Sequence, residues 1–481
     1  MPERNQPIHP SGGCGGLKPH VILAPHMADE TPLLELSAIS VRRGRSNVLN
    51  SVDLTVSSGD VVLLLGENGS GKSTLIEAAS GILRLSNGEV KHSGILIRDS
   101  EGRRSKPKPF GLTLQNGGFC QDELVRERIS AAIEVSGHIS NDEWISSELD
   151  DWSLRHRSND RIAWLSGGMK RRVGVLAGLV PALASNDATL ILLDEPSEGL
   201  DETSVNTLRN NIGSLASAGH AIIIATHDEN LLPLATRQIT VGNSSIVEQD
   251  ITENKKEVGL NIITPLEENN SSNFINNPAI KWSLMLEKRT KTSTISRSVS
   301  GLIALVVIAG MLAQIEPPSN TSWLALLALT PALISSLVKP GILTHLSDSR
   351  SQDWWNAHIG KNLQMSNILP PLNLIPFILT IISVYVIFGN ITFQAVIIGI
   401  VMSILCGGSS RIHALESTLP RQGATMIILL QIILIWPFLL LVDLLSMNAS
   451  NFASNDAQLQ LIVSTIIPLL VWGLLPMIAP E

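Results

Sequence analysis

A glycine-rich segment between a predicted strand and a predicted helix has the composition of a phosphate-binding loop. It follows the apolar run Val61–Leu65 and reads Gly66, Glu67, Asn68, Gly69, Ser70, Gly71, Lys72, Ser73 and Thr74. Glycines allow a tight loop whose backbone N–H groups point at the β- and γ-phosphates of a nucleotide, Lys72 supplies a positive charge, and the Ser73 hydroxyl suits Mg²⁺. The segment therefore predicts a site for the phosphates of a nucleotide, with Mg²⁺ as the metal.

Two acidic residues, Asp194 and Glu195, follow a second apolar run, residues 190–193. Ligands of an open α/β sheet bind at the carboxyl ends of its strands, which is where this pair would lie. We expect Asp194 to hold Mg²⁺, directly or through water, and Glu195 to polarise the water that attacks the γ-phosphate. The alternative is a structural pair that only caps a helix at a strand–helix junction.

A histidine, His227, follows a third apolar run, residues 221–226. A single histidine after a strand is more often structural than functional. This one comes at the end of a strand, as the phosphate loop and the acidic pair do, and such strand ends meet at one edge of a parallel sheet. We therefore predict that His227 contacts the γ-phosphate.

The segment Leu165-Ser166-Gly167-Gly168-Met169 resembles the signature motif of ABC ATPases. Gln115, which follows a short apolar run, resembles the glutamine that those domains carry after a strand, and Gly199-Leu200-Asp201 is similar to their loop after the catalytic glutamate. The motifs also stand in the family's order, and the resemblance covers residues 33–249. It implies an α/β P-loop NTPase (ABC ATPase) domain that hydrolyses ATP.

The resemblance implies roles for individual residues. Gln115 would join Ser73 and Asp194 as a Mg²⁺ ligand, and it would also line the ATP site. Glu195 and His227 would be the catalytic residues.

The signature motif implies a dimer. In this family the signature of one domain closes on the phosphate loop of another, so that Ser166, Gly167 and Gly168 would clamp the γ-phosphate in trans from a helix N-terminus. The chain carries one set of motifs. A working site therefore needs two chains, and we expect a second copy of the protein as the partner.

Two positions depart from the family pattern. The family usually places an aromatic residue upstream of the phosphate loop, to stack on adenine, and the counterpart here is near Arg43. A guanidinium can also stack on a base, so nucleotide binding is expected while selectivity for adenine stays open. Glu198 puts a charge where the family usually has a small residue, which is expected to slow hydrolysis without abolishing it.

The charged residues divide the chain into two unlike parts. Residues 298–481 hold 5 Lys/Arg and 7 Asp/Glu, whereas residues 1–297 hold 30 Lys/Arg and 36 Asp/Glu. The second part has too few charges to cover a water-soluble surface, so we predict an all-α transmembrane domain there. The acidic excess of the first part gives no electrostatic footprint for a nucleic-acid partner.

The apolar segments of the second part predict six membrane spans. They lie near residues 298–315, 322–338, 368–388, 391–407, 424–445 and 459–479. The five basic residues fall in alternate predicted loops, Lys339, Arg350 and Lys361 in one and Arg411 and Arg421 in another. With the ATPase in the cytosol, this bias predicts a multi-pass protein of the cytoplasmic membrane with both termini cytosolic.

The remaining segments are predicted to connect or extend these domains. Residues 1–32 are expected to be a disordered tail, in which His9, Cys14, His20 and His26 match no compact set of metal ligands. Residues 250–297 are expected to form a linker that contains either an interfacial helix or a plain linker helix at 281–291. Cys14, Cys120 and Cys406 form no CxxC pair, which fits a reducing compartment and argues against a disulfide framework or zinc site.

The apolar part also resembles a known permease. Residues 419–424, which lead into 427–441, and residues 331–337 are similar to the heme-exporter permease subunit of cytochrome c maturation, over residues 280–481. This implies a fused ATPase and permease acting in heme export or cytochrome c biogenesis, with heme-handling maturation proteins as partners beside membrane lipid. Two alternatives are an ABC exporter of another lipophilic or amphipathic solute, and ATP-driven release of a heme chaperone without solute translocation.

The longest predicted cytosolic loop, residues 339–367, is expected to transmit the ATPase stroke to the membrane. Its segment 354–359 could seat an apolar face in a groove beside Gln115, or it could lie on lipid as an interfacial helix. The loop histidines His345 and His358, like His413 in another loop, are expected to be structural rather than heme ligands.

Overall fold

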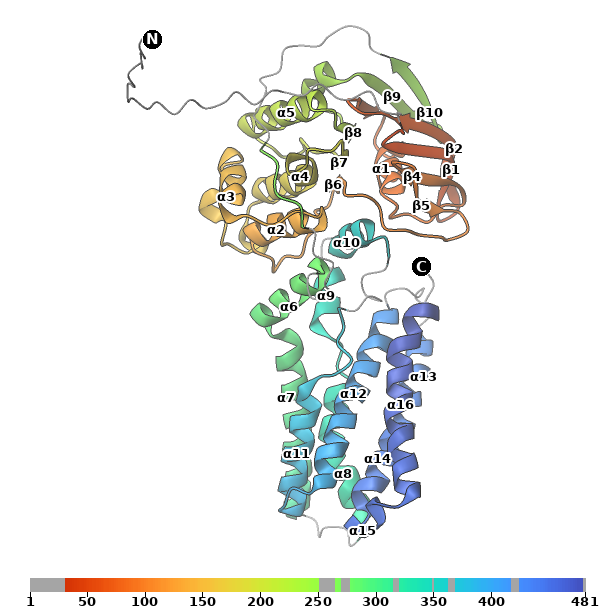
Figure 1. Cartoon of the computed structure of the whole chain (residues 1–481), viewed down its shortest axis with the longest axis vertical. Helices are drawn as coiled ribbons and strands as arrows, with labels where there is room; N and C mark the ends of the chain where they lie inside the picture. The colour runs from red at the N-terminus through yellow and green to blue at the C-terminus, as the bar shows by residue number, and fades with distance from the viewer. Residues whose placement is uncertain are drawn as a thin grey trace, which may run out of the picture. The chain divides into compact units, whose positions relative to one another are not determined.

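The computed structural model describes residues 31–250, 264–269, 277–314, 320–347, 350–361, 368–416 and 424–478. Residues Thr31–Glu481 form one compact unit, with the elements arranged as in Figure 1. The predicted tail and its candidate metal ligands lie outside the described residues, except for its last two positions. Arg421 and the segment 419–423 also lie outside them.

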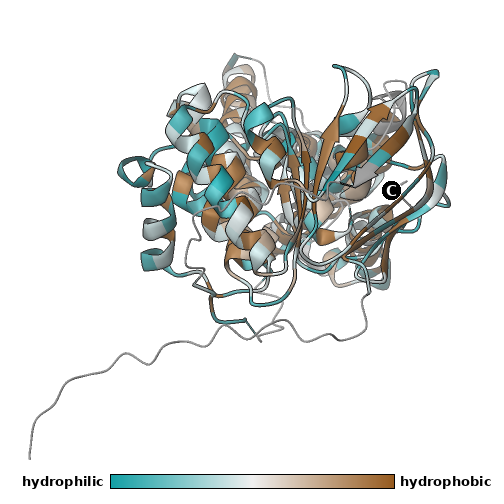
Figure 2. Cartoon of the chain, turned by 90° about the horizontal axis from the view of Figure 1, so that it is seen from above, coloured by the Kyte–Doolittle hydropathy of each residue, from teal (hydrophilic) through white to brown (hydrophobic). Residues whose placement is uncertain are grey.

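A six-stranded sheet forms the centre of the N-terminal domain, in the order β10-β9-β3-β8-β7-β6. Its strands are β3 (Val61–Leu65), β6 (Gly111–Thr113), β7 (Leu190–Asp194), β8 (Ala221–Ala225), β9 (Arg237–Gly242) and β10 (Ser245–Asp250). All neighbours pair in parallel except β9 and β10. The three apolar runs form the central strands β3, β8 and β7, and Figure 2 shows strands coloured as hydrophobic between helices with hydrophilic outer faces.

Helices and a second sheet cover this core. The second sheet is antiparallel, with strands β1 (Leu34–Arg43), β2 (Ser46–Val56), β4 (Asn87–His92) and β5 (Ile95–Asp99). The helices are α1 (Lys72–Ala79), α2 (Val125–Val135), α3 (Asp142–Asp151), α4 (Gly167–Leu183) and α5 (Glu202–Ser217). The α/β fold predicted for this part is confirmed.

The C-terminal region is helical. Its apolar helices are α7 (Thr292–Gln314), α8 (Thr321–Ser336), α11 (Leu374–Phe388), α12 (Phe393–Glu416), α13 (Ala424–Ile433), α14 (Ile435–Ser446) and α16 (Asn455–Ile478), with the short α15 (Ala449–Phe452) between the last two. Among the described residues, five stretches are long and apolar enough to cross a membrane. They correspond to five of the six predicted spans. The sixth, predicted at 368–388, forms only the shorter helix α11, because residues 368–373 are not helical.

Three helices of the C-terminal half pack into the core of the N-terminal domain. They are α6 (Pro278–Thr290), α9 (Gly341–Ser347) and α10 (Ser351–Ile359). Trp282 of α6, Leu346 of α9 and Trp355 of α10 all belong to the same buried cluster as the central sheet. Trp282 and Leu286 of α6 face protein, whereas Leu284 is exposed, so the choice between an interfacial helix and a plain linker helix at 281–291 stays a prediction. An amphipathic pattern identifies an apolar face but not what covers it.

One basic residue lies elsewhere than predicted. Arg411 was expected in a loop, but α12 continues to Glu416, so Arg411 lies inside this helix. Its side chain is buried, and its guanidinium lies 5.0 Å from the ring centre of Trp472. An aromatic ring can hold the guanidinium of a long arginine side chain, so a basic residue need not mark the end of an apolar helix.

Candidate nucleotide site

The predicted phosphate loop joins β3 to α1, as the sequence requires. Gly66 has a φ of 140°, and a Cβ there would lie 2.4 Å from the carbonyl oxygen of Val241, so only glycine fits. The Lys72 ammonium donates to the carbonyl oxygens of Gly66 at 2.7 Å and Glu67 at 3.0 Å. The loop thus encloses a positive charge beside the N-terminus of α1, where phosphate groups bind.

Asp194 and Ser73 lie together in a geometry that fits a magnesium ion. The Ser73 hydroxyl donates to Asp194 Oδ1 at 2.9 Å. Asp194 Oδ2 is buried and has no hydrogen-bond partner among the described residues. Mg²⁺ prefers oxygen ligands. The carboxylate oxygen without a hydrogen-bond partner and the neighbouring hydroxyl are both of this kind, and they lie beside the phosphate loop. The ion would neutralise phosphate charge, and these two side chains would hold it.

Glu195 lies beside His227 at the same edge of the sheet. Glu195 Oε1 is 3.3 Å from His227 Nε2, and the Glu195 backbone has a φ of 49°. Burial raises the pKa of Glu195, although His227 and Lys72 oppose that effect. A raised pKa suits a carboxylate that must take a proton from water, as a general base does.

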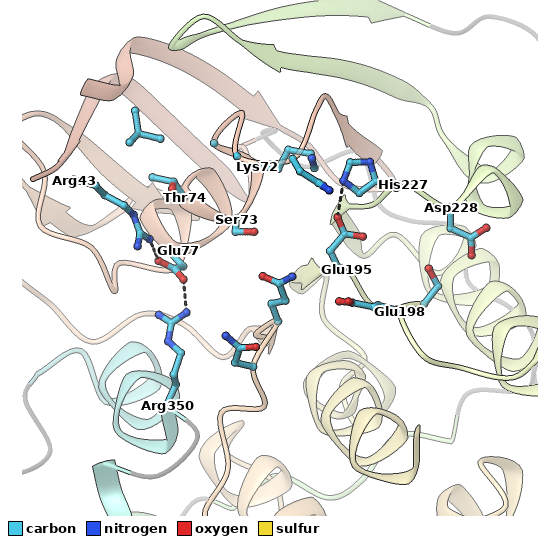
Figure 3. A pocket seen from close by; sticks show the side chains of 17 residues that line it. Arg43, Lys72, Ser73, Thr74, Glu77, Glu195, Glu198, His227, Asp228 and Arg350 are labelled. Atoms are coloured by element: carbon cyan, nitrogen blue, oxygen red, sulfur yellow. Dashed lines mark hydrogen bonds and ion pairs between the residues drawn. The ribbon is translucent and has the colours of Figure 1, made fainter. Parts of the chain in front are cut away.

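Most of these groups line one cavity of about 870 Å³, which Figure 3 shows from close by, although Asp194 is not among its described lining residues. Its wall includes Lys72, Ser73, Gln115, Glu195 and His227, as predicted for the ATP site. The structure thus brings the phosphate loop, the glutamine, the glutamate and the histidine together around a volume that suits a nucleotide. The Mg²⁺ contact of Gln115 and the catalytic roles stay predictions.

The signature motif lies at the start of α4. Ser166 caps this helix, and its Oγ accepts a hydrogen bond from the Met169 N–H at 3.3 Å. Neither Ser166 nor its two following glycines is among the described residues that line the nucleotide cavity. This placement is what the prediction of a site shared by two chains requires.

Three further residues of the site were not predicted from the sequence. Arg171 of α4 donates to the backbone carbonyl oxygens of Asp194, at 2.6 Å, and Glu195. Glu77 is buried and forms ion pairs with both Arg43 and Arg350, and all three residues line the cavity (Figure 3). Arg350 comes from the loop that precedes α10, so the C-terminal half contributes to the nucleotide cavity. No local pattern predicts such a contact, because the partners are far apart in sequence.

The apparent affinity of the site for Mg²⁺ is expected to fall in mild acid. Burial raises the pKa of Asp194 to about 6, with Ser73 opposing the effect. As the pH falls through that value, the carboxylate takes up a proton that Mg²⁺ must displace. We therefore expect Mg²⁺ affinity about tenfold lower at pH 5 than at pH 7, measured as the Mg²⁺ dependence of ATP binding.

The variant Asp194→Asn is the control for this pH dependence. It carries no titratable group at the position, so it reports how protonation of the nucleotide phosphates alone affects binding. The wild-type protein should lose more Mg²⁺ affinity than this variant between pH 7 and pH 5. Equal losses in the two proteins would show that Asp194 does not hold the metal.

Comparisons with known proteins agree with this geometry. The profile of the family described as "ABC transporter" matches residues 49–198. A macrolide export ATP-binding/permease protein of Azoarcus sp. (strain BH72) is 32% identical over 227 residues, which are 45% of this chain and 34% of the relative. A pyoverdine export ATP-binding/permease protein of Pseudomonas syringae pv. tomato is 29% identical over 230 residues, again 45% and 34% of the two chains. The chain thus spans about a third of the length of these relatives.

A shorter relative is matched over most of its length. The hemin import ATP-binding protein of Myxococcus xanthus is 34% identical over 225 residues, which are 45% of this chain and 83% of that protein. Among solved structures, one described as a dimeric post-hydrolysis state of an ATP-binding cassette bound to ADP and phosphate aligns over 46% of this chain and 99% of its own. Its identity is 22% and its TM-score 0.40, so we infer nothing from it about this chain.

Proposed function

The chain belongs to the ABC transporter family through its N-terminal ATPase domain, and from this premise we propose that it is an ATP-driven exporter that works as a dimer of two such chains. The ATPase domain and the apolar helices share one chain, as the names of the two export relatives describe for those proteins. We further propose that it is a multi-pass protein of the cytoplasmic membrane with both termini cytosolic.

The main support for this proposal is that α10 packs into the core of the ATPase domain. The Trp354 and Trp355 side chains are almost fully buried, and the Arg128 guanidinium lies 3.6 Å from the ring centre of Trp354. The Cβ position of Gly118, three residues after Gln115, is 3.3 Å from Trp354 Cβ. A helix that connects two apolar helices is thus anchored beside the nucleotide cavity, where a change in that cavity can move it.

The contacts of two histidines that were predicted to lie in loops, His358 on α10 and His413 on α12, support structural roles over heme ligation. His358 faces the carbonyl oxygens of Trp354 and Phe110 with its two ring nitrogens, at 2.7 Å and 3.2 Å. Its ring also stacks on Phe110 with centres 4.7 Å apart. His413 Nε2 lies 2.9 Å from the carbonyl oxygen of Leu337. Both rings are engaged within the protein fold.

We propose a lipophilic or amphipathic solute as the substrate class, with heme in cytochrome c biogenesis as one member of it. The similarity of the apolar part to the heme-exporter permease supports heme. The names of the two export relatives support another amphipathic solute. In the remaining alternative, hydrolysis releases a heme chaperone from partner proteins and no solute crosses the membrane.

Inside-out membrane vesicles that contain the full chain test this proposal. Hemin, a macrolide and a lipophilic fluorescent dye are the probes, and ATP-dependent accumulation of each is compared with vesicles carrying the Glu195→Gln variant. Accumulation of hemin alone would favour the heme role, and accumulation of another probe the wider exporter. ATP hydrolysis without accumulation of any probe would instead favour mechanical release of a chaperone.

The variant Trp355→Ala is expected to uncouple hydrolysis from transport. Removing a fully buried indole lowers the free energy of unfolding by about 3–5 kcal/mol. This loss of packing should release α10 from the ATPase core. ATP hydrolysis should persist, while probe accumulation per ATP hydrolysed falls to background. Trp355→Phe keeps most of the ring volume and should keep the coupling. An equal loss of hydrolysis and accumulation in Trp355→Ala would indicate simple destabilisation and contradict this role.

A further inference from the structure

Three side chains with metal-ligand chemistry meet where α9 contacts the ATPase domain. Cys120 and Asp122 lie in the segment between β6 and α2, and His345 lies on α9. One ligand atom from each, the sulfur, a carboxylate oxygen and a ring nitrogen, lies within 4.8 Å of the other two. Cys120 and His345 are buried and Asp122 is half-buried, so this is not an exposed acidic cluster.

The spacing of the histidine nitrogen and the carboxylate oxygen suits one small divalent ion, and the cysteine sulfur lies within 4.8 Å of both. His345 Nδ1 is 3.3 Å from Asp122 Oδ2. Two ligands each about 2.0–2.1 Å from a tetrahedral zinc ion stand about 3.3 Å apart, and a thiolate at about 2.3 Å lies slightly farther away. A cysteine, a histidine and an aspartate supply three ligands of the kinds that zinc takes, which leaves the fourth position to water.

Neighbouring side chains contact two of the three ligands. Groups that hydrogen-bond to metal ligands commonly hold those ligands in orientation. His345 Nε2, the nitrogen that faces away from Asp122, lies 3.4 Å from the Thr292 hydroxyl. Arg161 donates to Asp122 Oδ1 at 3.1 Å, which leaves Oδ2 to face the histidine. Thr292 thus fixes the orientation of the His345 ring, and Arg161 fixes that of the Asp122 carboxylate. The His345 and Asp122 atoms that would bind the metal stay free to face it.

We propose that Cys120, Asp122 and His345 bind one divalent ion of the zinc class, with water as the fourth ligand. The thiol loses its proton to solvent when the ion binds, so that the thiolate becomes the ligand. Cys120 and Asp122 are two residues apart, but His345 comes from a distant segment, so the sequence does not show the three ligands as one set. The ion joins the ATPase segment 120–122 to α9.

Cobalt(II) titration of the purified full-length chain, in detergent and without nucleotide, tests the proposal directly. Thiolate-bound cobalt absorbs in the near ultraviolet through charge transfer from sulfur, and carboxylate or histidine ligands do not produce that band. We expect the band to saturate at one cobalt per chain and to disappear when zinc is added in equal amount.

The three cysteines of the chain provide matched variants. Cys120→Ser should abolish the charge-transfer band, whereas Cys406→Ser and Cys14→Ser should leave it unchanged. His345→Gln should weaken cobalt binding by about tenfold or more. ATP binding by each variant shows that the ATPase domain remains folded, so that a lost band reports a lost ligand.

Four results would overturn the proposal. The first is the absence of a band in the wild-type protein, which would leave His345 and Asp122 as an ion pair only. The second is a band that survives Cys120→Ser. The third is a band that disappears in Cys14→Ser, which would move the site to the N-terminal segment. The fourth is unchanged cobalt affinity in His345→Gln. ATP hydrolysis enters none of these measurements, so the metal site and the exporter proposal can fail separately.

Discussion

Replacing Glu195 by glutamine is expected to slow ATP hydrolysis by on the order of 10²–10⁴-fold, the usual contribution of a general base, while ATP binding persists. Glutamine has the same shape as glutamate but cannot accept the proton of the attacking water. The carboxylate is placed for that task, with Oε1 3.3 Å from His227 Nε2 and a pKa raised by burial. The Glu195→Gln protein should therefore bind ATP normally and be slow only in the hydrolysis step.

The control for this variant is a second carboxylate in the same cavity. Glu198 also lines the nucleotide cavity, so Glu198→Gln removes the same charge from the same wall. Hydrolysis should stay within a few-fold of wild type, or rise if the charge of Glu198 slows the reaction. Single-turnover hydrolysis and binding of labelled ATP separate chemistry from affinity. A Glu195→Gln protein that hydrolyses ATP at the wild-type rate would contradict the role given to Glu195.

Lys72→Ala and Ser166→Arg are expected to abolish turnover by different routes. Lys72 supplies the charge inside the phosphate loop, and losing a charge-assisted hydrogen bond should weaken ATP binding about 10- to 100-fold. Ser166 is absent from the described lining of the cavity in its own chain, so Ser166→Arg should leave ATP binding to one chain nearly unchanged. Hydrolysis should still fall by on the order of 10²-fold, because donors to the γ-phosphate from the partner are lost.

Equilibrium binding of labelled ATP distinguishes these two routes. Lys72→Ala should need about 10- to 100-fold more ATP than the wild-type protein for half-saturation. Ser166→Arg should bind with near wild-type affinity and hydrolyse almost nothing. A Ser166→Arg protein with full ATPase activity would show that each chain completes its own site.

Much of the nucleotide site could be predicted because parallel strands impose a simple rule. The apolar runs that became β3, β7 and β8 are continuous, as strands buried on both faces must be. Their carboxyl ends meet at one edge, so residues at or just after those ends, such as Asp194 and His227, had to lie close to the phosphate loop. The chemistry of each residue type then indicated its task.

Other contacts could not be predicted because they join segments without a local pattern. Glu77 lies on α1, and nothing in that helix indicates that Arg350 would reach it. The amphipathic stripe of α6 indicated an apolar partner, but lipid and protein are equally apolar, so the sequence could not show that Trp282 donates to Glu123 at 2.7 Å. Hydropathy predicted the apolar helices but not the shortness of α11.

Complementation between two inactive variants tests most directly the central claim that ATP is hydrolysed in sites shared by two chains. Lys72→Ala and Ser166→Arg, coexpressed in equal amounts, place both defects in one site of a mixed dimer and leave the other site intact. Half of the dimers should be mixed, so we expect about a quarter of wild-type ATPase activity from two proteins that are each inactive alone. Activity no higher than that of either variant alone would contradict the shared site.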